Sequence, residues 1–290
     1  MKILITGANG QVGWELQRAL APLGEVVALG RDALDLSSAD AIRHRMREIA
    51  PNLIVNAAAY TAVDKAEEDS ELAHLVNGIA PGVMAEEAKL LNAALVHYST
   101  DYVFDGLKGA PYEEIDATHP ASVYGTTKLA GEKAITAVGA PHLILRTSWV
   151  YGARGKNFMR TMLRLANERD ELRVVDDQIG APTWSRMIAL ATGVILTQCL
   201  HKGAVADVLR DKGGLYHLTA AGHTSWFGFA SEIVRHTENP PRMIPITTAE
   251  YPLPAPRPAY SVMSNAKLAR VFDIRLPDWQ ASLALCADDA

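Results

Sequence analysis

Short apolar runs alternate with longer amphipathic stretches through the first half of the chain. The apolar runs occupy residues 2–6, 25–29, 53–55, 94–98 and 142–146. The stretches between them, which are typical of helices, occupy residues 12–23, 41–50, 65–92 and 124–138. Ser38 stands at a capping position before the second of these helices. Apolar strands that alternate with helices indicate a parallel sheet covered on both faces. The pattern therefore predicts an α/β fold with a Rossmann-type, doubly wound parallel sheet.

The two halves of the chain differ in regularity. Residues 1–150 form one predicted doubly wound unit, and part of 183–220 is expected to return to it. Residues 151–290 are expected to form mainly a smaller C-terminal α/β lobe. Residues 240–258 contain seven of the chain's 15 prolines. That content is typical of a surface loop with an extended backbone, but it also suits a rigid loop that closes one side of a pocket.

Ligands on an open parallel sheet bind beyond the carboxyl ends of its strands. This rule selects the segments at 7–13, 30–36, 56–61, 99–101 and 146–151. The first has glycines at positions 7, 10 and 13, between a predicted strand and a predicted helix. Glycines allow a tight turn and let a pyrophosphate reach the free N–H groups of a helix N-terminus. The GxxGxxG spacing differs from the usual GxGxxG, but in this context it favours dinucleotide binding over a simple glycine-rich turn.

Charged residues follow the second predicted strand, where an adenosine ribose would lie. An acid at this place suits a free 2′-hydroxyl, whereas an arginine suits a 2′-phosphate. The sequence offers Arg31, Asp32 and Asp35. Arg31 favours NADPH over NADH, although all three can also be solvated loop charges.

Tyr124 and Lys128 are four residues apart on a predicted helix, so their side chains share one face. A lysine charge near a phenol favours the phenolate, so we expect the pKa of Tyr124 to lie below its usual value of about 10. Thr100 ends a predicted central strand. Its hydroxyl can hydrogen-bond a carbonyl oxygen and hold it beside the tyrosine. The three residues indicate acid–base chemistry on a carbonyl group.

Composition narrows the range of partners. Apolar residues make up 49% and charged residues 21% of the 290 residues, which excludes an intrinsically disordered chain. The formal net charge of −5 gives no general attraction to nucleic acid or to anionic lipid. No stretch of about 18 apolar residues predicts a membrane span, and the first apolar run is too short for a secretion signal. With only two cysteines, Cys199 and Cys286, we expect a cytoplasmic protein without disulfides or zinc.

Together, the glycine spacing, Thr100 and the Tyr124-xxx-Lys128 pair resemble the extended short-chain dehydrogenase/reductases. Further motifs narrow this resemblance to members that reduce nucleotide-linked sugars, and the match extends from residue 1 to about residue 270. They are GQVGWEL at 10–16, NAAAYTAVDKAE at 56–67, STDYVF at 99–104, YGTTKLAGE at 124–132, RTSWVYG at 146–152, DQIGAPT at 177–183 and RPxxS at 257–261.

The resemblance implies roles for the matching positions. The implied catalytic residues are Thr100, Tyr124 and Lys128. The implied cofactor contacts are Gly7, Gly10, Gln11, Val12 and Gly13 at the pyrophosphate, Arg31, Asp35 and Leu36 at the adenosine, and Ala58, Ala59, Tyr60, Tyr124 and Lys128 near the nicotinamide. The implied contacts of the nucleotide sugar are Thr100, Asp101, Trp149 and Arg257. The second half of the chain would then be mainly a substrate-binding lobe.

The implied reaction is the NAD(P)H-dependent reduction of the C4 carbonyl of dTDP-4-dehydro-β-L-rhamnose to dTDP-L-rhamnose, the last step of dTDP-rhamnose biosynthesis. Related nucleotide-sugar dehydratases carry Asp-Glu after the strand-end threonine, and those carboxyls serve the elimination of water. Here Asp101 and Tyr102 follow Thr100, so one acid–base group is missing and simple carbonyl reduction is favoured. The alternatives are another nucleotide-sugar reductase or epimerase, and a non-catalytic dinucleotide-binding regulatory subunit.

The same resemblance implies a magnesium ion at a dimer contact, held by carboxylates. Glu15 matches one ligand, but residues 184–200, which should supply the others, contain no Asp or Glu. Because Mg²⁺ prefers oxygen ligands, we expect neither this metal site nor the dimer built around it. Glu15 is left as a weak ligand candidate, and a homodimer of another kind stays open.

Overall fold

Six parallel strands form the main sheet of the protein, whose computed structural model describes residues 1–235 and 237–288. Their spatial order is β10-β5-β4-β3-β1-β2. They are β1 (Lys2–Thr6), β2 (Glu25–Leu29), β3 (Leu53–Asn56), β4 (Ala94–Thr100), β5 (His142–Thr147) and β10 (Gly214–His217). Because β2 lies on one side of β1 and the later strands lie on the other, the topological switch point falls between β1 and β3. The predicted doubly wound parallel sheet is confirmed.

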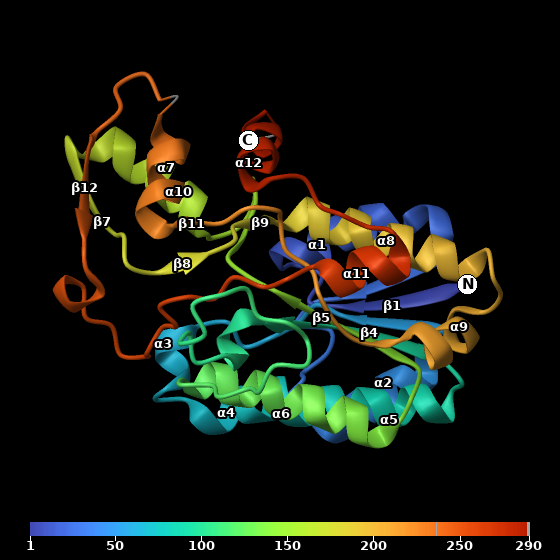
Figure 1. Ribbon diagram of the computed structural model, residues 1–290. Coiled ribbons are helices and arrows are strands. Elements are labelled where there is room, and N and C mark those ends of the chain that lie inside the picture. The colour runs from blue at the N-terminus through green and yellow to red at the C-terminus, as the bar shows by residue number, and fades with distance from the viewer. Residues whose placement is uncertain (236, 289–290) are drawn as a thin grey trace.

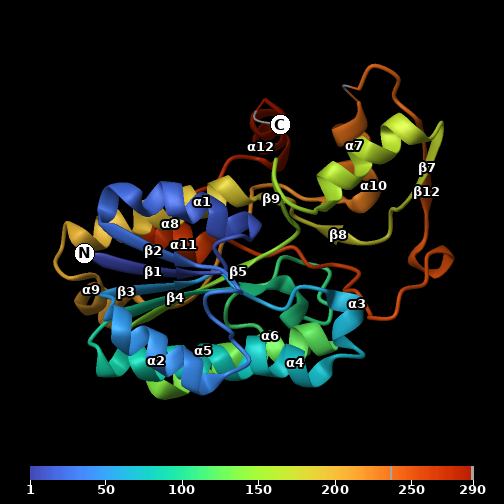
Figure 2. The ribbon, with the colours of Figure 1, turned by 180° about the vertical axis from the view of Figure 1, so that it is seen from behind.

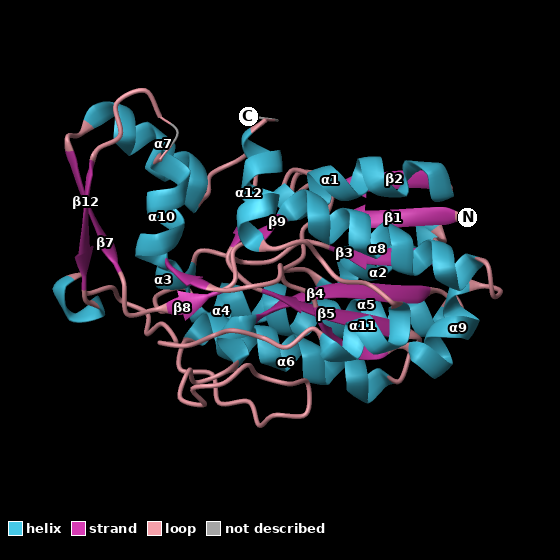
Figure 3. Ribbon diagram, turned by 45° about the horizontal axis from the view of Figure 1, so that its top comes forward, coloured by secondary structure: helices cyan, strands magenta, loops and turns pink. Residues whose placement is uncertain are grey.

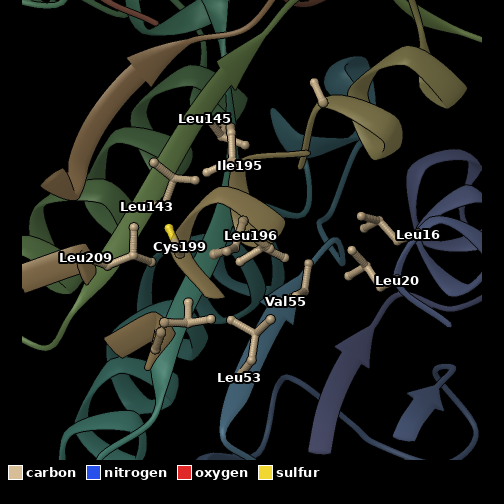
Figure 4. Close-up of a cluster of buried hydrophobic side chains, with 14 of the residues drawn as sticks. Leu16, Leu20, Leu53, Val55, Leu143, Leu145, Ile195, Leu196, Cys199 and Leu209 are labelled. Carbon is tan, nitrogen blue, oxygen red and sulfur yellow. The ribbon is translucent and has the colours of Figure 1, made fainter. Parts of the chain in front are cut away.

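Helices cover both faces of the sheet (Figures 1 and 2). One face carries α1 (Gln11–Leu20), α8 (Ser185–Leu200), α9 (Val205–Lys212) and α11 (Ala266–Phe272). The other carries α2 (Ala39–Ile49), α5 (Ala80–Leu90) and α6 (Val123–Val138). Alternation along each strand fills both cores, since Ile3 and Ile5 pack with the first group and Leu4 packs with the second. Figure 4 shows the first core, where leucines of α1 and α8 meet Leu53, Val55 and Leu145 of the strands.

A second lobe stands apart from this sheet (Figure 3). The paired strands β7 (Glu171–Val175) and β12 (Arg242–Ile246) lie there with α7 (Phe158–Glu168), α10 (Trp226–Val234) and α12 (Trp279–Ala287). Two short pairs complete it, namely β6 (Val150–Tyr151) with β9 (Thr183–Trp184) and β8 (Ile179–Gly180) with β11 (Thr224–Ser225). The chain leaves this lobe after β9 and returns to the main sheet through α8, α9 and β10, which pairs with β5.

Of three local predictions from the sequence, the structure confirms one and modifies two. Ser38 caps α2, since its hydroxyl accepts a hydrogen bond from the Ala41 N–H group. The helical stretch expected over 65–92 is divided into α3 (Val63–Ala66), α4 (Ser70–His74), a π-helical turn at Leu75–Ile79 and α5. The proline-rich stretch at 240–258 is not all loop, because it contains β12. Pro245 fits there because a strand with a free edge tolerates a missing N–H donor.

Within the described residues, no single helix has the length and apolar character needed to cross a membrane. Helices α8 and α9 reach that length and composition only together, and a bend of 103° separates them.

Candidate active site

The turn from β1 into the first turn of α1 is packed so closely that only glycine fits at two of its positions. Gly7 has a φ of +73°, and a Cβ there would lie 2.7 Å from the Ala58 nitrogen. A Cβ on Gly13 would lie 2.1 Å from the Gly7 carbonyl oxygen. Gly10 stands at the N-cap of α1 and places no side chain on the first turn. The N–H groups that open α1 are therefore accessible to an anion.

A cavity of about 620 Å³ opens beside this loop, at the carboxyl ends of the strands. That size lies within the range of about 300–1,000 Å³ typical of small-molecule sites. All of the predicted cofactor residues except Gly13 line it. They are Gly7, Gly10, Gln11, Val12, Arg31, Asp35, Leu36, Ala58, Ala59, Tyr60, Tyr124 and Lys128. Gly13 instead lies behind the loop, against Gly7.

At the end of the cavity near β2, one acidic side chain is already hydrogen-bonded and one positively charged side chain is exposed. The Asp35 carboxylate accepts hydrogen bonds from the Ser37 hydroxyl and N–H group, at 2.7 and 2.9 Å. These bonds hold the pKa of Asp35 below its usual value, so this group is anionic at neutral pH. Arg31 is exposed and reaches the cavity from the same loop.

The loop at 58–60 is fastened to α6 by Asn77. Asn77 lies in the π-helical turn and is buried. Its Oδ1 accepts the Tyr60 N–H at 2.8 Å, and its Nδ2 donates to the Tyr60 carbonyl at 3.1 Å and to Thr127 Oγ1 at 3.2 Å. A π turn often marks a functional site because it redirects one side chain. The sequence pattern gave no sign of this contact.

Tyr124 and Lys128 lie one turn apart on α6 and line the same cavity. Ser122 caps the helix by accepting the Gly125 N–H at 3.1 Å, which fixes where α6 begins. Thr100 ends β4 beside Tyr124 and donates to Asp101 Oδ1 at 3.1 Å. The structure therefore brings the three predicted catalytic residues together.

The expected direction of the Tyr124 pKa is wrong for the free protein. Burial raises the pKa of this phenol to about 12, and the neighbouring Thr100 hydroxyl opposes that rise only in part. Burial also lowers the pKa of Lys128 to about 8, because it disfavours the charged amine. Tyr124 consequently keeps its proton at neutral pH, which is the form needed to donate a proton.

The four predicted sugar-binding residues lie outside the lining of this cavity. Asp101 is buried, and burial raises the pKa of its carboxyl to about 6. Trp149 has a φ of +47°, and its ring stacks on that of Trp226 with centroids 3.6 Å apart. Arg257 makes a two-pronged ion pair with Asp64, with N–O distances of 2.7 and 2.8 Å. This pair joins the loop at 255–257 to α3, so the Arg257 charge is already compensated in the free protein.

Known proteins match the chain over its full length. The family model described as RmlD substrate binding domain matches residues 1–290. A dTDP-4-dehydrorhamnose reductase from Burkholderia thailandensis is 51% identical over 297 residues, which cover 100% of this chain and 99% of the relative. The chain belongs to the dTDP-4-dehydrorhamnose reductase family. The family resemblance expected from the motifs is confirmed.

Solved structures of dTDP-4-dehydrorhamnose reductases have the same fold. The enzyme from Clostridium acetobutylicum superposes with a TM-score of 0.90 at 40% identity, covering 99% of both chains. The Bacillus anthracis enzyme, solved in complex with NADP, also gives a TM-score of 0.90, at 34% identity over 100% of this chain and 99% of that one.

Glu15 does not face a cluster of carboxylates in this member of the reductase family. Its side chain is largely buried between α1 and α8, where Oε2 accepts a hydrogen bond from Arg186 Nε at 3.2 Å. A guanidinium therefore stands where a metal held by Glu15 would need further oxygen ligands. Across residues 1–235 and 237–288, no three His, Cys, Asp or Glu side chains are grouped to hold a metal ion. The residues present do not fit the magnesium site that the family resemblance implied.

Sequence reasoning missed several residues that line the cavity of this reductase family member, and two of them lie in one loop. Gly155 and Lys156 line the cavity beside Gly10 and Gln11. Asn157 fastens their loop by donating to Gln11 Oε1 at 3.0 Å and to the Gly152 carbonyl at 2.8 Å. The glycine-flanked, basic run GARGKN at 152–157 was the available signal. It follows a predicted strand end, where a phosphate contact is expected.

Proposed function

We propose that this protein reduces the C4 carbonyl of dTDP-4-dehydro-β-L-rhamnose to dTDP-L-rhamnose with NADPH, in the cytoplasm. The observation that carries the proposal is the shared cavity, in which Tyr124 and Lys128 lie beside the glycine loop of α1. The full-length identity of 51% to a dTDP-4-dehydrorhamnose reductase supports the substrate. The NADP complex of the Bacillus anthracis relative supports the cofactor.

The residues around the cavity fit a dinucleotide. The glycine loop would hold the pyrophosphate, because no side chain caps the first turn of α1 and its N–H groups are free to bind an anion. The close backbone packing at Gly7 and Gly13 keeps this loop free of side chains there. Arg31 would bind a 2′-phosphate, and the loop at 58–60 would line the nicotinamide pocket. When bound, the reduced nicotinamide supplies a hydride for the carbonyl carbon.

The chain's own groups hold and protonate the sugar. When the sugar binds, the Thr100 hydroxyl proton, which points to Asp101 in the free protein, turns to the C4 oxygen and keeps it beside Tyr124. The Tyr124 phenol, protonated in the free protein, gives its proton to that oxygen as negative charge develops there. The second lobe, with Trp149, and the Asp101 carboxyl hold the nucleotide sugar over these groups.

An absorbance assay tests the activity directly. The purified protein is mixed with dTDP-4-dehydro-β-L-rhamnose and either NADPH or NADH. We expect the absorbance of the reduced nicotinamide to fall in proportion to the dTDP-L-rhamnose formed. An epimerase would instead change the sugar without net loss of NADPH, and a non-catalytic dinucleotide-binding subunit would change neither.

Arg31→Ala should weaken NADPH binding without weakening NADH binding. Losing one charged contact with a 2′-phosphate costs about 1.5 kcal/mol, or roughly a tenfold rise in Kd. Fluorescence titration of each nucleotide measures this, and the Kd of NADH is the internal control. Equal changes for both nucleotides would show that Arg31 does not contact the 2′-phosphate.

Lys156→Gln should weaken both nucleotides equally. Lys156 lines the cavity near Gln11, at the pyrophosphate that both nucleotides share. The expected rise in Kd is also about tenfold, and it should shrink as salt screens the charge. Lys133→Gln, which changes an exposed lysine on α6 outside the cavity lining, is the matched control. A rise confined to NADPH would instead place Lys156 at the 2′-phosphate.

A further inference from the structure

A line of buried polar side chains runs from Lys128 into the core. Lys128 Nζ lies 3.2 Å from His97 Nε2, and His97 Nδ1 lies 3.0 Å from Asn56 Nδ2. Asn56 Oδ1 then accepts the Thr6 hydroxyl at 2.6 Å. His97 is fully buried, and Thr6, Asn56 and Lys128 are at most 2% exposed. No residue in this line except Lys128 has a role in the proposed function.

The backbone fixes which way the Asn56 amide faces. The Ala58 N–H can only donate, and it points at Asn56 Oδ1 from 3.2 Å. Oδ1 must therefore be the acceptor on that side, and the Asn56 NH₂ group faces His97. Because that NH₂ group donates, His97 Nδ1 has to accept, so it carries no proton. A neutral imidazole with a bare Nδ1 bears its proton on Nε2.

That proton points at Lys128. An ammonium has three donors and no acceptor, so it would oppose the Nε2–H group of His97. A neutral amine accepts from Nε2–H through its lone pair and still donates to the Tyr98 carbonyl at 2.7 Å. We propose that Asn56 and His97 are positioning residues that hold Lys128 as a neutral amine in the free enzyme.

The surroundings of Lys128 agree with this arrangement. Burial holds the pKa of His97 well below its usual value. It also lowers the pKa of Lys128 to about 8, and the opposing His97 Nε2–H group lowers it further, so that the neutral amine prevails at pH 7. Of the other ionisable groups near Lys128, Tyr124 keeps its proton, and Glu132 is an anion already bound by Arg146. Glu132 favours the ammonium, and burial outweighs it.

In this arrangement the charge of Lys128 depends on whether Tyr124 holds its proton. On the proposed function, on which this consequence rests, Tyr124 becomes a phenolate when it gives up its proton. An anion one helical turn away favours the ammonium, so Lys128 takes up a proton from water and compensates the phenolate. Lys128 is thus uncharged before the reaction and charged once Tyr124 has reacted.

Nitrogen-15 NMR of histidine-labelled protein tests the arrangement without any turnover. His97→Gln identifies the His97 signals by their loss. We expect wild-type His97 to be neutral at pH 7 with its proton on Nε2. Thr6→Val, the matched control, leaves the Ala58 N–H on Asn56 and should keep this tautomer. A wild-type His97 with its proton on Nδ1, or with both nitrogens protonated, would overturn the proposal.

Asn56→Asp should move the His97 proton from Nε2 to Nδ1. A carboxylate at this place accepts from Ala58 and Thr6 and also from His97 Nδ1–H, which leaves Nε2 free to accept from a Lys128 ammonium. We expect the His97 proton on Nδ1. The Lys128 ammonium then favours the Tyr124 phenolate, so the alkaline limb of the kcat/KM profile, which Tyr124 sets, should lie about one pH unit lower. A proton that stays on Nε2, or an unshifted limb in an active variant, would contradict the proposal. If the wild type reduces no sugar, the proposed function fails while the NMR result still stands.

Discussion

Tyr124→Phe lowers kcat for the reduction by about 10²–10⁴-fold, the range that a positioned proton donor contributes. The phenol oxygen is the only group removed, and it lies beside the Thr100 hydroxyl. The rest of the ring stays packed at right angles to Tyr102, with centroids 5.6 Å apart. Nucleotide binding should therefore change little. Steady-state kinetics give kcat, and fluorescence titration gives the Kd of NADPH.

Tyr216→Phe is the matched control for this variant. Its hydroxyl donates to the Lys212 carbonyl within the core, away from the cavity. Losing that bond costs about 1 kcal/mol of stability, with no expected effect on kcat. A Tyr124→Phe enzyme with near wild-type kcat would exclude Tyr124 as the proton donor.

Glu132→Gln lowers the free energy of unfolding by about 3–5 kcal/mol, because it leaves a buried charge without its partner. Arg146 donates to the Glu132 carboxylate from Nε at 2.8 Å and from Nη2 at 2.6 Å. The two side chains are only 3% and 6% exposed, so water cannot replace the lost carboxylate. The pair joins α6, which carries Tyr124 and Lys128, to β5 of the main sheet. Urea denaturation followed by circular dichroism measures the loss.

Glu168→Gln on α7 is the comparison. Glu168 pairs with Arg164 at 2.6 Å, but these side chains are 50% and 59% exposed. An exposed pair contributes only about 0–1 kcal/mol, since water and salt screen it. Similar losses for the two variants would mean that the Glu132 pair is not a buried anchor of α6.

The sequence predicted those parts of the molecule that depend on local order along the chain. Strands that are apolar throughout, followed by Gly7, Thr100 or Tyr60, placed the candidate residues at one edge of a parallel sheet. The strand order did not have to be known, because the carboxyl ends of parallel strands meet whatever their order. The helix over 124–138 followed from its residue pattern, and the spacing of Tyr124 and Lys128 put both side chains on one face of it.

Contacts between distant segments escaped sequence reasoning. Asn77 holds the Tyr60 backbone from a π-helical turn, and Asn157 holds Gln11 from the start of α7. No periodicity encodes such pairs, since each depends on how two separate elements are packed. The direction of the Tyr124 pKa was wrong for a related reason. The lysine four residues after Tyr124 is visible in the sequence, whereas the burial that raises the pKa of Tyr124 and lowers that of Lys128 is a property of the fold.

Transfer of deuterium from NADPH that carries deuterium at both C4 positions of the nicotinamide tests the central claim most directly. The protein is incubated with this nucleotide and dTDP-4-dehydro-β-L-rhamnose, and the sugar product is examined by NMR. The account predicts dTDP-L-rhamnose with deuterium at sugar C4, and one oxidised nucleotide for each sugar formed. A product without deuterium at C4, or a changed sugar with the nucleotide still reduced, would contradict it.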